Sequence, residues 1–234
     1  MTSGKLPIER LVYPGFWFGK TDPRDALRLA QRGVGGFCIY GGCAQEISDL
    51  TSWLRRESGW ELIFCADYED GTGQWVKEGT LLPSNMAIGA SGSLAFAARK
   101  AEITALEAAA LGVDWILAPV VDLADNPDNP IVNTRSFGAA PDLVVEMAGA
   151  YLYGLKQSGA FSCLKHFPGH GGSSKDSHLE LPTIKASRQE LDRNELYPYQ
   201  KLANRADAVM VGHLMAQSLD SRFPASSSSK IMNR

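Results

Sequence analysis

Six short apolar runs recur along this 234-residue chain, and segments with helical periodicity lie between them. The runs are LVYPGFWFG, GGFCIYGG, ELIFCAD, DWILAPVVD, FSCLKHF and AVMVGH. Strands that are apolar on both faces and alternate with helices are typical of a parallel sheet covered by helices. The sequence therefore predicts an α/β fold with six parallel strands.

Local start and stop signals bound the helices between these runs. Asp22 followed by Pro23 is typical of a helix N-terminus, and a glycine follows each predicted helix. The predicted helices are Pro23 to Gly33, Leu94 to Leu111 and Pro141 to Gly159. A further helix is predicted to begin after a cap near Ser229.

Two α/β architectures compete, the open doubly wound sheet and the closed eight-stranded barrel. No G-x-G-x-x-G or Walker pattern follows the first run, which disfavours the nucleotide-binding sheet. Polar residues instead stand at the C-terminal ends of successive strands, which is where the active-site residues of a barrel lie. These residues are Asp67, Asp122, Lys165, His166 and His213. We therefore predict a partial (β/α)8 TIM-type barrel with about six of its eight units.

Composition excludes several classes of partner. A net charge of -3 and the lack of a Lys/Arg run disfavour nucleic acid, and no apolar stretch reaches the ~18 residues of a membrane span. We expect a cytoplasmic protein that binds a small neutral or anionic ligand. Cys38, Cys65 and Cys163 lie inside apolar runs and are predicted to be reduced core residues.

The segment KHFPGHGGSSKDSHLELP, residues 165–182, holds three of the four histidines. His166 and His170 are four residues apart, but Pro168 and Gly169 prevent the helix that would place them on one face. We predict no metal and no cofactor, and a metal-dependent hydrolase stays as an alternative. An Asp two residues before a His, as in Asp176 and His178, can orient the imidazole as a general acid/base.

The same segment resembles the signature of glycoside hydrolase family 3, in the branch of bacterial β-N-acetylglucosaminidases. ADYEDGTGQWV, PVVDLADNPDNPIVNTRSFG and VMVGHLM are similar to further segments of that family, so that the resemblance covers nearly the whole chain. It implies that residues 1–234 are the N-terminal catalytic barrel of a retaining hydrolase. The implied substrate is a carbohydrate with a terminal β-linked N-acetylglucosamine (GlcNAc), such as a cell-wall fragment.

The resemblance also implies roles for individual residues. Those expected to bind the hydroxyls of the first sugar are Asp67, Arg135, Lys165 and His166. His178 is the expected acid/base, and Asp176 orients it, on a loop kept flexible by Gly169, Gly171 and Gly172. His170 is expected to help fold that loop. As alternatives, Asp67 and Arg135 form a buried ion pair, and Lys165 and His166 anchor the loop.

Two departures from the family pattern affect function. The family's nucleophile is an Asp after a seventh strand, which residues 1–234 do not reach, so we expect a C-terminally truncated barrel that is inactive alone. Residues 72–76, TGQWV, stand where cell-wall-recycling members usually carry arginines, and Trp75 could stack on a sugar. The alternatives are a non-catalytic sugar-binding protein, a β-glucosidase-type activity, or a glycosidase that uses phosphate.

Overall fold

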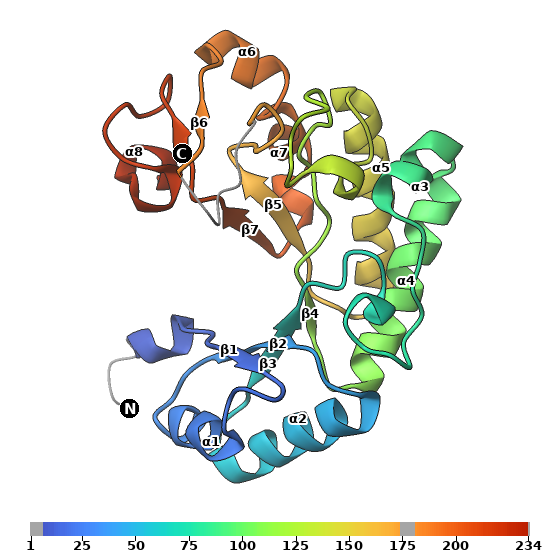
Figure 1. Ribbon diagram of the computed structural model, residues 1–234, viewed down its shortest axis with the longest axis vertical. Helices are drawn as coiled ribbons and strands as arrows, with labels where there is room; N and C mark the ends of the chain where they lie inside the picture. The colour runs from blue at the N-terminus through green and yellow to red at the C-terminus, as the bar shows by residue number, and fades with distance from the viewer. Residues whose placement is uncertain (1–6, 174–180, 234) are drawn as a thin grey trace.

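The computed structural model describes residues 7–173 and 181–233. Its strands are all paired in parallel, and the ribbon forms an open arc (Figure 1). Each of the six predicted runs contains one strand of this arc. They are β1 (Gly15–Trp17), β2 (Gly36–Tyr40), β3 (Ile63–Ala66), β4 (Trp115–Ile116), β5 (Cys163–Phe167) and β7 (Ala208–Val211). The prediction of six parallel strands is confirmed.

The arc consists of two sheets that meet between β4 and β5. Strands β1 to β4 are neighbours in chain order, and β5 pairs with β7. Between the two sheets, isolated bridges pair Trp115 with Phe161 and Val120 with Lys165. The strand order therefore continues from β4 to β5, as in the wall of a (β/α)8-type barrel.

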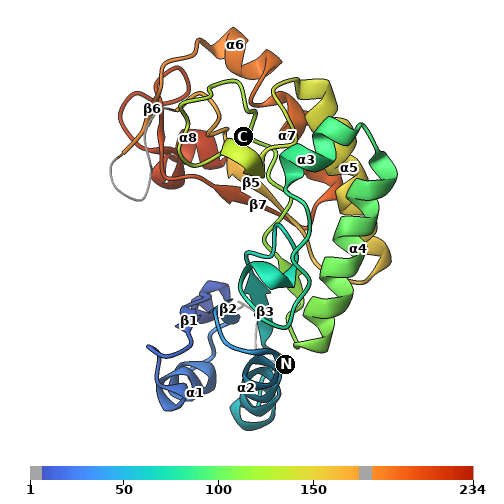
Figure 2. The ribbon, with the colours of Figure 1, turned by 45° about the vertical axis from the view of Figure 1, so that its right-hand side comes forward.

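Helices cover the outer side of the arc, as Figures 1 and 2 show. They are α1 (Pro23–Gln31), α2 (Ala44–Ser58), α3 (Asn85–Ser91), α4 (Leu94–Ala110), α5 (Pro141–Gln157), α6 (Arg188–Arg193), α7 (Tyr197–Leu202) and α8 (Ser229–Met232). The Asp22 side chain caps α1 by accepting from the Arg24 amide at 2.8 Å. Helix α8 is capped by Ser228, one residue before the predicted position. None of these helices, within 7–173 and 181–233, is long and apolar enough to span a bilayer.

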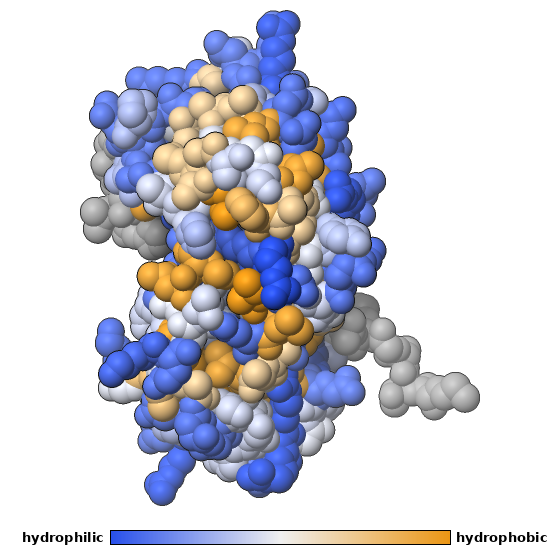
Figure 3. Space-filling view, turned by 90° about the vertical axis from the view of Figure 1, so that its right-hand side faces the viewer, coloured by the Kyte–Doolittle hydropathy of each residue, from blue (hydrophilic) through white to orange (hydrophobic). Residues whose placement is uncertain are grey.

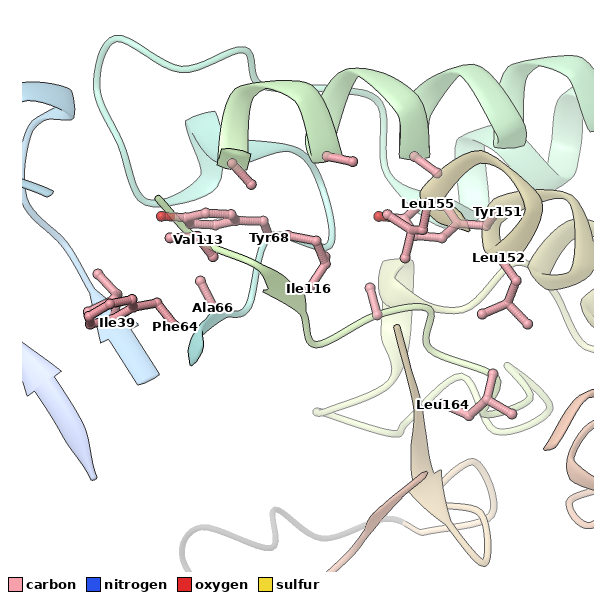
Figure 4. Close-up of a cluster of buried hydrophobic side chains, with 14 of the residues drawn as sticks. Ile39, Phe64, Ala66, Tyr68, Val113, Ile116, Tyr151, Leu152, Leu155 and Leu164 are labelled. Carbon is pink, nitrogen blue, oxygen red and sulfur yellow. The ribbon is translucent and has the colours of Figure 1, made fainter. Parts of the chain in front are cut away.

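The main core lies between the sheets and the helices that cover them, and it includes residues of α1, α2, α4 and α5. Figure 4 shows Tyr151 and Leu155 of α5 beside Ile116 of β4. Gly154 lets the helices approach closely, because a Cβ there would lie 2.2 Å from the carbonyl oxygen of Ala98. The outer face formed by the helices mixes hydrophobic and hydrophilic side chains (Figure 3). The three predicted core cysteines are buried and free, which confirms that prediction.

Two further strands were not predicted. β6 (Thr183–Ile184) and β8 (Met215–Ala216) pair in parallel beside the main arc. They cover a separate small core that includes Leu191 of α6 and Ile231 of α8. Two residues are too few to show a periodic pattern of apolar and polar side chains, so the sequence does not predict these strands.

Candidate active site

The carboxyl ends of the barrel strands surround one polar cavity of about 510 Å³. Its lining includes Tyr40, Asp67, Glu69, Trp75, Arg135, Lys165, His166, His170 and His213. All four predicted sugar-binding residues are therefore brought together. A second cavity, of about 500 Å³, lies against α6, α7 and β7, is mainly apolar, and has its charged residues Arg188 and Asp192 paired with each other. The chemistry-bearing groups gather in the first cavity.

Lys165 lies at the centre of the charged groups. Its ammonium is 2.6 Å from a carboxylate oxygen of Asp67 and 2.6 Å from one of Glu69, and its side chain is 1% exposed. Burial would lower the pKa of Lys165, but the two carboxylates raise it, so the ammonium stays charged. An ammonium has three donors, and two are used here. The described residues supply no further partner for the third donor.

Arg135 grips Glu69 through both carboxylate oxygens. Its Nε and Nη2 donate at 2.8 and 2.7 Å, and Nη1 donates to the Ile131 carbonyl at 3.2 Å. Burial would raise the pKa of Glu69, but Lys165 and Arg135 together lower it to about 2. The expected alternative, an ion pair between Asp67 and Arg135, is wrong because Arg135 binds Glu69. Asp67 keeps its Oδ2 without a hydrogen bond to the described chain.

His166 is oriented by a buried carboxylate. Its Nδ1–H donates to Asp122 Oδ2 at 2.7 Å, and Nε2 faces Arg135 Nη2 at 3.4 Å. Asp122 also accepts from the amides of His166 and His170, so it anchors the start of the histidine loop. Burial would raise the pKa of Asp122, but His166 and these amides lower it.

His170 has a structural place beside this pair. Its side chain is buried, and its carbonyl accepts from Asn129 Nδ2 at 2.8 Å. Burial lowers its pKa, so the ring is held neutral. The contacts are made by the His170 backbone, and neither ring nitrogen has a hydrogen-bond partner among the described residues, so a role in folding the loop stays a prediction.

Two of the three loop glycines, Gly169 and Gly171, lie where another part of the chain approaches closely. A Cβ at Gly169 would lie 2.4 Å from Glu195, and a Cβ at Gly171 would lie 2.2 Å from the Leu123 carbonyl oxygen. Gly169 also has a φ of 125°, which disfavours other residues. The first half of the loop is therefore tightly packed, and at Gly169 and Gly171 the glycine is required by close approach.

The predicted dyad of Asp176 and His178 lies outside the described residues. In the part of the chain that is described, His, Cys, Asp and Glu side chains form no group of three that could hold a metal ion. His213 lies at the cavity mouth, and its Nδ1 is 2.6 Å from Ser226 Oγ.

Glu69 is the central residue that the sequence analysis missed. It follows Asp67 by two positions, in the turn after β3 that the Gly71 amide closes on the Tyr68 carbonyl. This spacing was the available signal, because it places both carboxylates toward Lys165. Asp122 was noted at the end of its strand, but its role as the partner of His166 was not predicted.

The sequence profile described as "Glycosyl hydrolase family 3 N terminal domain" matches residues 10–234. The chain belongs to glycosyl hydrolase family 3. It is 36% identical over 198 residues to a beta-N-acetylglucosaminidase/beta-glucosidase of Cellulomonas fimi, covering 83% of this chain and 35% of that protein. The family resemblance in the sequence is thereby confirmed.

Solved structures of family 3 proteins have the same fold. A beta-N-acetylglucosaminidase from Paenibacillus sp. superposes with a TM-score of 0.89 at 32% identity, covering 96% of this chain and 44% of that one. A beta-glucoside phosphorylase, BglX, gives 0.91 at 27% identity, covering 97% and 43%. These similarities confirm the partial (β/α)8-type barrel, and this chain spans less than half the length of each of these proteins.

Proposed function

We propose that this chain supplies the sugar-binding and acid/base parts of a retaining glycoside hydrolase that removes a terminal β-linked GlcNAc. The observation that carries the proposal is the convergence of Asp67, Arg135, Lys165 and His166 on one cavity at the carboxyl ends of the strands. Family 3 membership and the named activities of the relatives support it.

The contacts suggest how the first sugar is held. Asp67 is fixed through Oδ1 and can accept from a sugar hydroxyl through Oδ2. Lys165 and Arg135 have donors that their partners do not use, and they are rigidly placed by Glu69. A flexible neutral ring would thus meet an acceptor and two donors whose positions are already set.

The catalytic groups of the proposal come from the resemblance. His178 acts as general acid toward the glycosidic oxygen and then as base toward water, and Asp176 fixes its tautomer. The nucleophile is assigned to an Asp that the resemblance places after a seventh barrel strand, outside residues 1–234. No cofactor is needed for this chemistry.

Calorimetric titration with GlcNAc tests the binding half of the proposal. Asp67→Asn weakens binding about tenfold or more, because an amide replaces a charged acceptor. Asp49→Asn, on the exposed surface of α2, is the matched control and leaves binding unchanged. Wild-type protein that gives no heat with GlcNAc at millimolar concentration would contradict the proposal.

A phosphate-using reaction is the second candidate. The similarity to a beta-glucoside phosphorylase favours it, and imidazole in place of a carboxylate acid/base would not repel phosphate. Parallel assays on an aryl β-GlcNAc, with the nucleophile-bearing part present, tell the two apart. Glycosyl phosphate formed only when inorganic phosphate is added indicates phosphorolysis, and free sugar in both assays indicates hydrolysis.

A further inference from the structure

Three aromatic side chains gather on the rim of the cavity, on the side of Asp67. Trp17 ends β1, Tyr40 ends β2, and Trp75 follows the short 3₁₀ turn Thr72–Gln74. Trp17 and Tyr40 are stacked with ring centroids 4.1 Å apart, and Trp75 meets Tyr40 nearly at right angles at 5.7 Å. We call these three residues the aromatic rim.

Trp75 is held in a fixed orientation and remains open to solvent. Its Nε1 donates to the backbone carbonyl of Asp67 at 3.0 Å, which ties the indole to the residue proposed to bind the first sugar. The indole is 37% exposed and lines the cavity together with Tyr40. A rigid, exposed aromatic surface beside a polar cavity is typical of a ligand-binding site.

Trp17 has a supporting role within the rim. One of its faces is stacked on Tyr40, and Lys20 Nζ lies 5.2 Å from its ring centre. Trp17 is 41% exposed but does not line the cavity, so the surface that the rim presents to the cavity is formed by Trp75 and Tyr40.

Within the described residues, the cavity lining holds no Lys or Arg other than Lys165 and Arg135. Both of these cations are engaged with carboxylates, Lys165 with Asp67 and Glu69, and Arg135 with Glu69. Thr72 is buried and donates to Glu107, away from the cavity. Gln74 accepts from the Asp70 amide through Oε1, so its Nε2 can donate to a hydroxyl. This surface suits a neutral ligand with an apolar face and hydroxyl edges.

On the basis of the proposed function, we propose that the aromatic rim binds the second sugar of the substrate, and that this sugar is neutral. A pyranose with equatorial substituents presents an apolar C–H face that can stack on Trp75 while its hydroxyl edge meets Gln74. Among the described residues that line the cavity, every Lys and Arg already has a carboxylate partner, so a sugar carboxylate would find no free cation there. Lys20, which lies 5.2 Å from the ring centre of Trp17, is not part of that lining. The rim thus selects GlcNAc linked to a neutral sugar over GlcNAc linked to an acidic one.

Calorimetric titrations with three ligands test this proposal. They are GlcNAc, GlcNAc-β-1,4-GlcNAc, and the same disaccharide with N-acetylmuramic acid as its second sugar. In the wild type the neutral disaccharide binds about tenfold tighter than GlcNAc, and in Trp75→Ala the ratio of the two affinities falls to about one. Trp75→Phe keeps part of the gain. Trp60→Ala is the matched control, since Trp60 is also exposed but is stacked with Arg10 away from the cavity.

The outcomes separate the two proposals. Equal affinity for GlcNAc and the neutral disaccharide overturns the aromatic subsite and leaves the first-sugar site standing. A Trp75→Ala variant that loses both ligands equally overturns it as well, because the residue would then be structural. Tighter binding of the acidic disaccharide overturns the claim of neutrality. Failure of the wild type to bind GlcNAc overturns the proposed function itself.

Discussion

Arg135 holds both carboxylate oxygens of Glu69, although 66 positions separate the two residues in the chain. The same carboxylate lies 2.6 Å from Lys165 Nζ. The Glu69 and Lys165 side chains are 2% and 1% exposed, so the centre of this ion pair network is shielded from solvent, whereas Arg135 remains 30% exposed. Removing one partner of a buried pair leaves an uncompensated charge, which is strongly destabilising. Glu69 thereby connects the proposed sugar site to the stability of the barrel.

Glu69→Gln is expected to lower the free energy of unfolding at neutral pH by about 3 kcal/mol. The pKa of Glu69 is depressed to about 2 in the folded state, so its stabilisation is present above about pH 4.5 and is lost as pH falls toward 2. Urea unfolding at several pH values should therefore show weaker acid dependence in the variant. Glu57→Gln, on the surface of α2, should match the wild type, and an unchanged acid slope in Glu69→Gln contradicts the assignment.

His166 is expected to carry its proton on Nδ1, because the carboxylate of Asp122 can only accept there. Nitrogen NMR of labelled protein at a pH where the ring is neutral should show Nε2 unprotonated. Asp122→Asn should give a mixture of tautomers, since an amide can donate as well as accept. A wild-type ring protonated on Nε2 would be incompatible with this geometry.

The glycines of α5 form a matched pair for a packing test. Gly154→Ala should destabilise the protein by about 1–3 kcal/mol, because its methyl group would collide with the Ala98 carbonyl of α4. Gly149→Ala places its methyl against the end of the Arg205 side chain, which can move. That variant should be neutral or stabilised by up to about 1 kcal/mol from helix propensity. Thermal unfolding of both variants measures the difference, and equal effects would refute close helix packing at Gly154.

Glu195 is buried beside Gly169, and none of the residues that the structure describes donates a hydrogen bond to its Oε2. Burial raises the pKa of Glu195, so ionisation as pH rises above about 4.5 costs folding free energy. Glu195→Gln should raise the free energy of unfolding at about pH 7.5, and this gain should exceed the effect of the same substitution at about pH 4.5 by on the order of 1 kcal/mol. Chemical denaturation at both pH values tests this, with Glu61→Gln on the surface as the control. A pH-independent effect of Glu195→Gln would show that the carboxyl is not desolvated.

The sequence was informative wherever the physical cause is local. Apolar runs located all six barrel strands, and Asp22 with Pro23 located the start of α1, because burial and capping act over a few residues. Strand-end polarity also predicted that Asp67, Lys165 and His166 share one cavity. The ion-pair partners of these groups could not be predicted in the same way. Arg135 pairs with Glu69 and not with Asp67 because of the three-dimensional course of two loops. The lack of space for a side chain at Gly169 and Gly171 could not be predicted for the same reason, because the residues that approach them, Glu195 and Leu123, are distant in the sequence.

The two sheets of the arc meet through isolated bridges, and Lys165 of one sheet reaches Asp67 and Glu69 at the end of the other. Lys165 and Asp67, which are proposed to bind the sugar, therefore also connect the two sheets of the barrel wall. A substitution at these positions that changes the substrate specificity therefore also lowers the stability of the fold. Trp75 of the aromatic rim and the neighbouring Gln74 take no part in these ion pairs, which makes them the more tolerant starting points for the divergence or engineering of new substrate preferences.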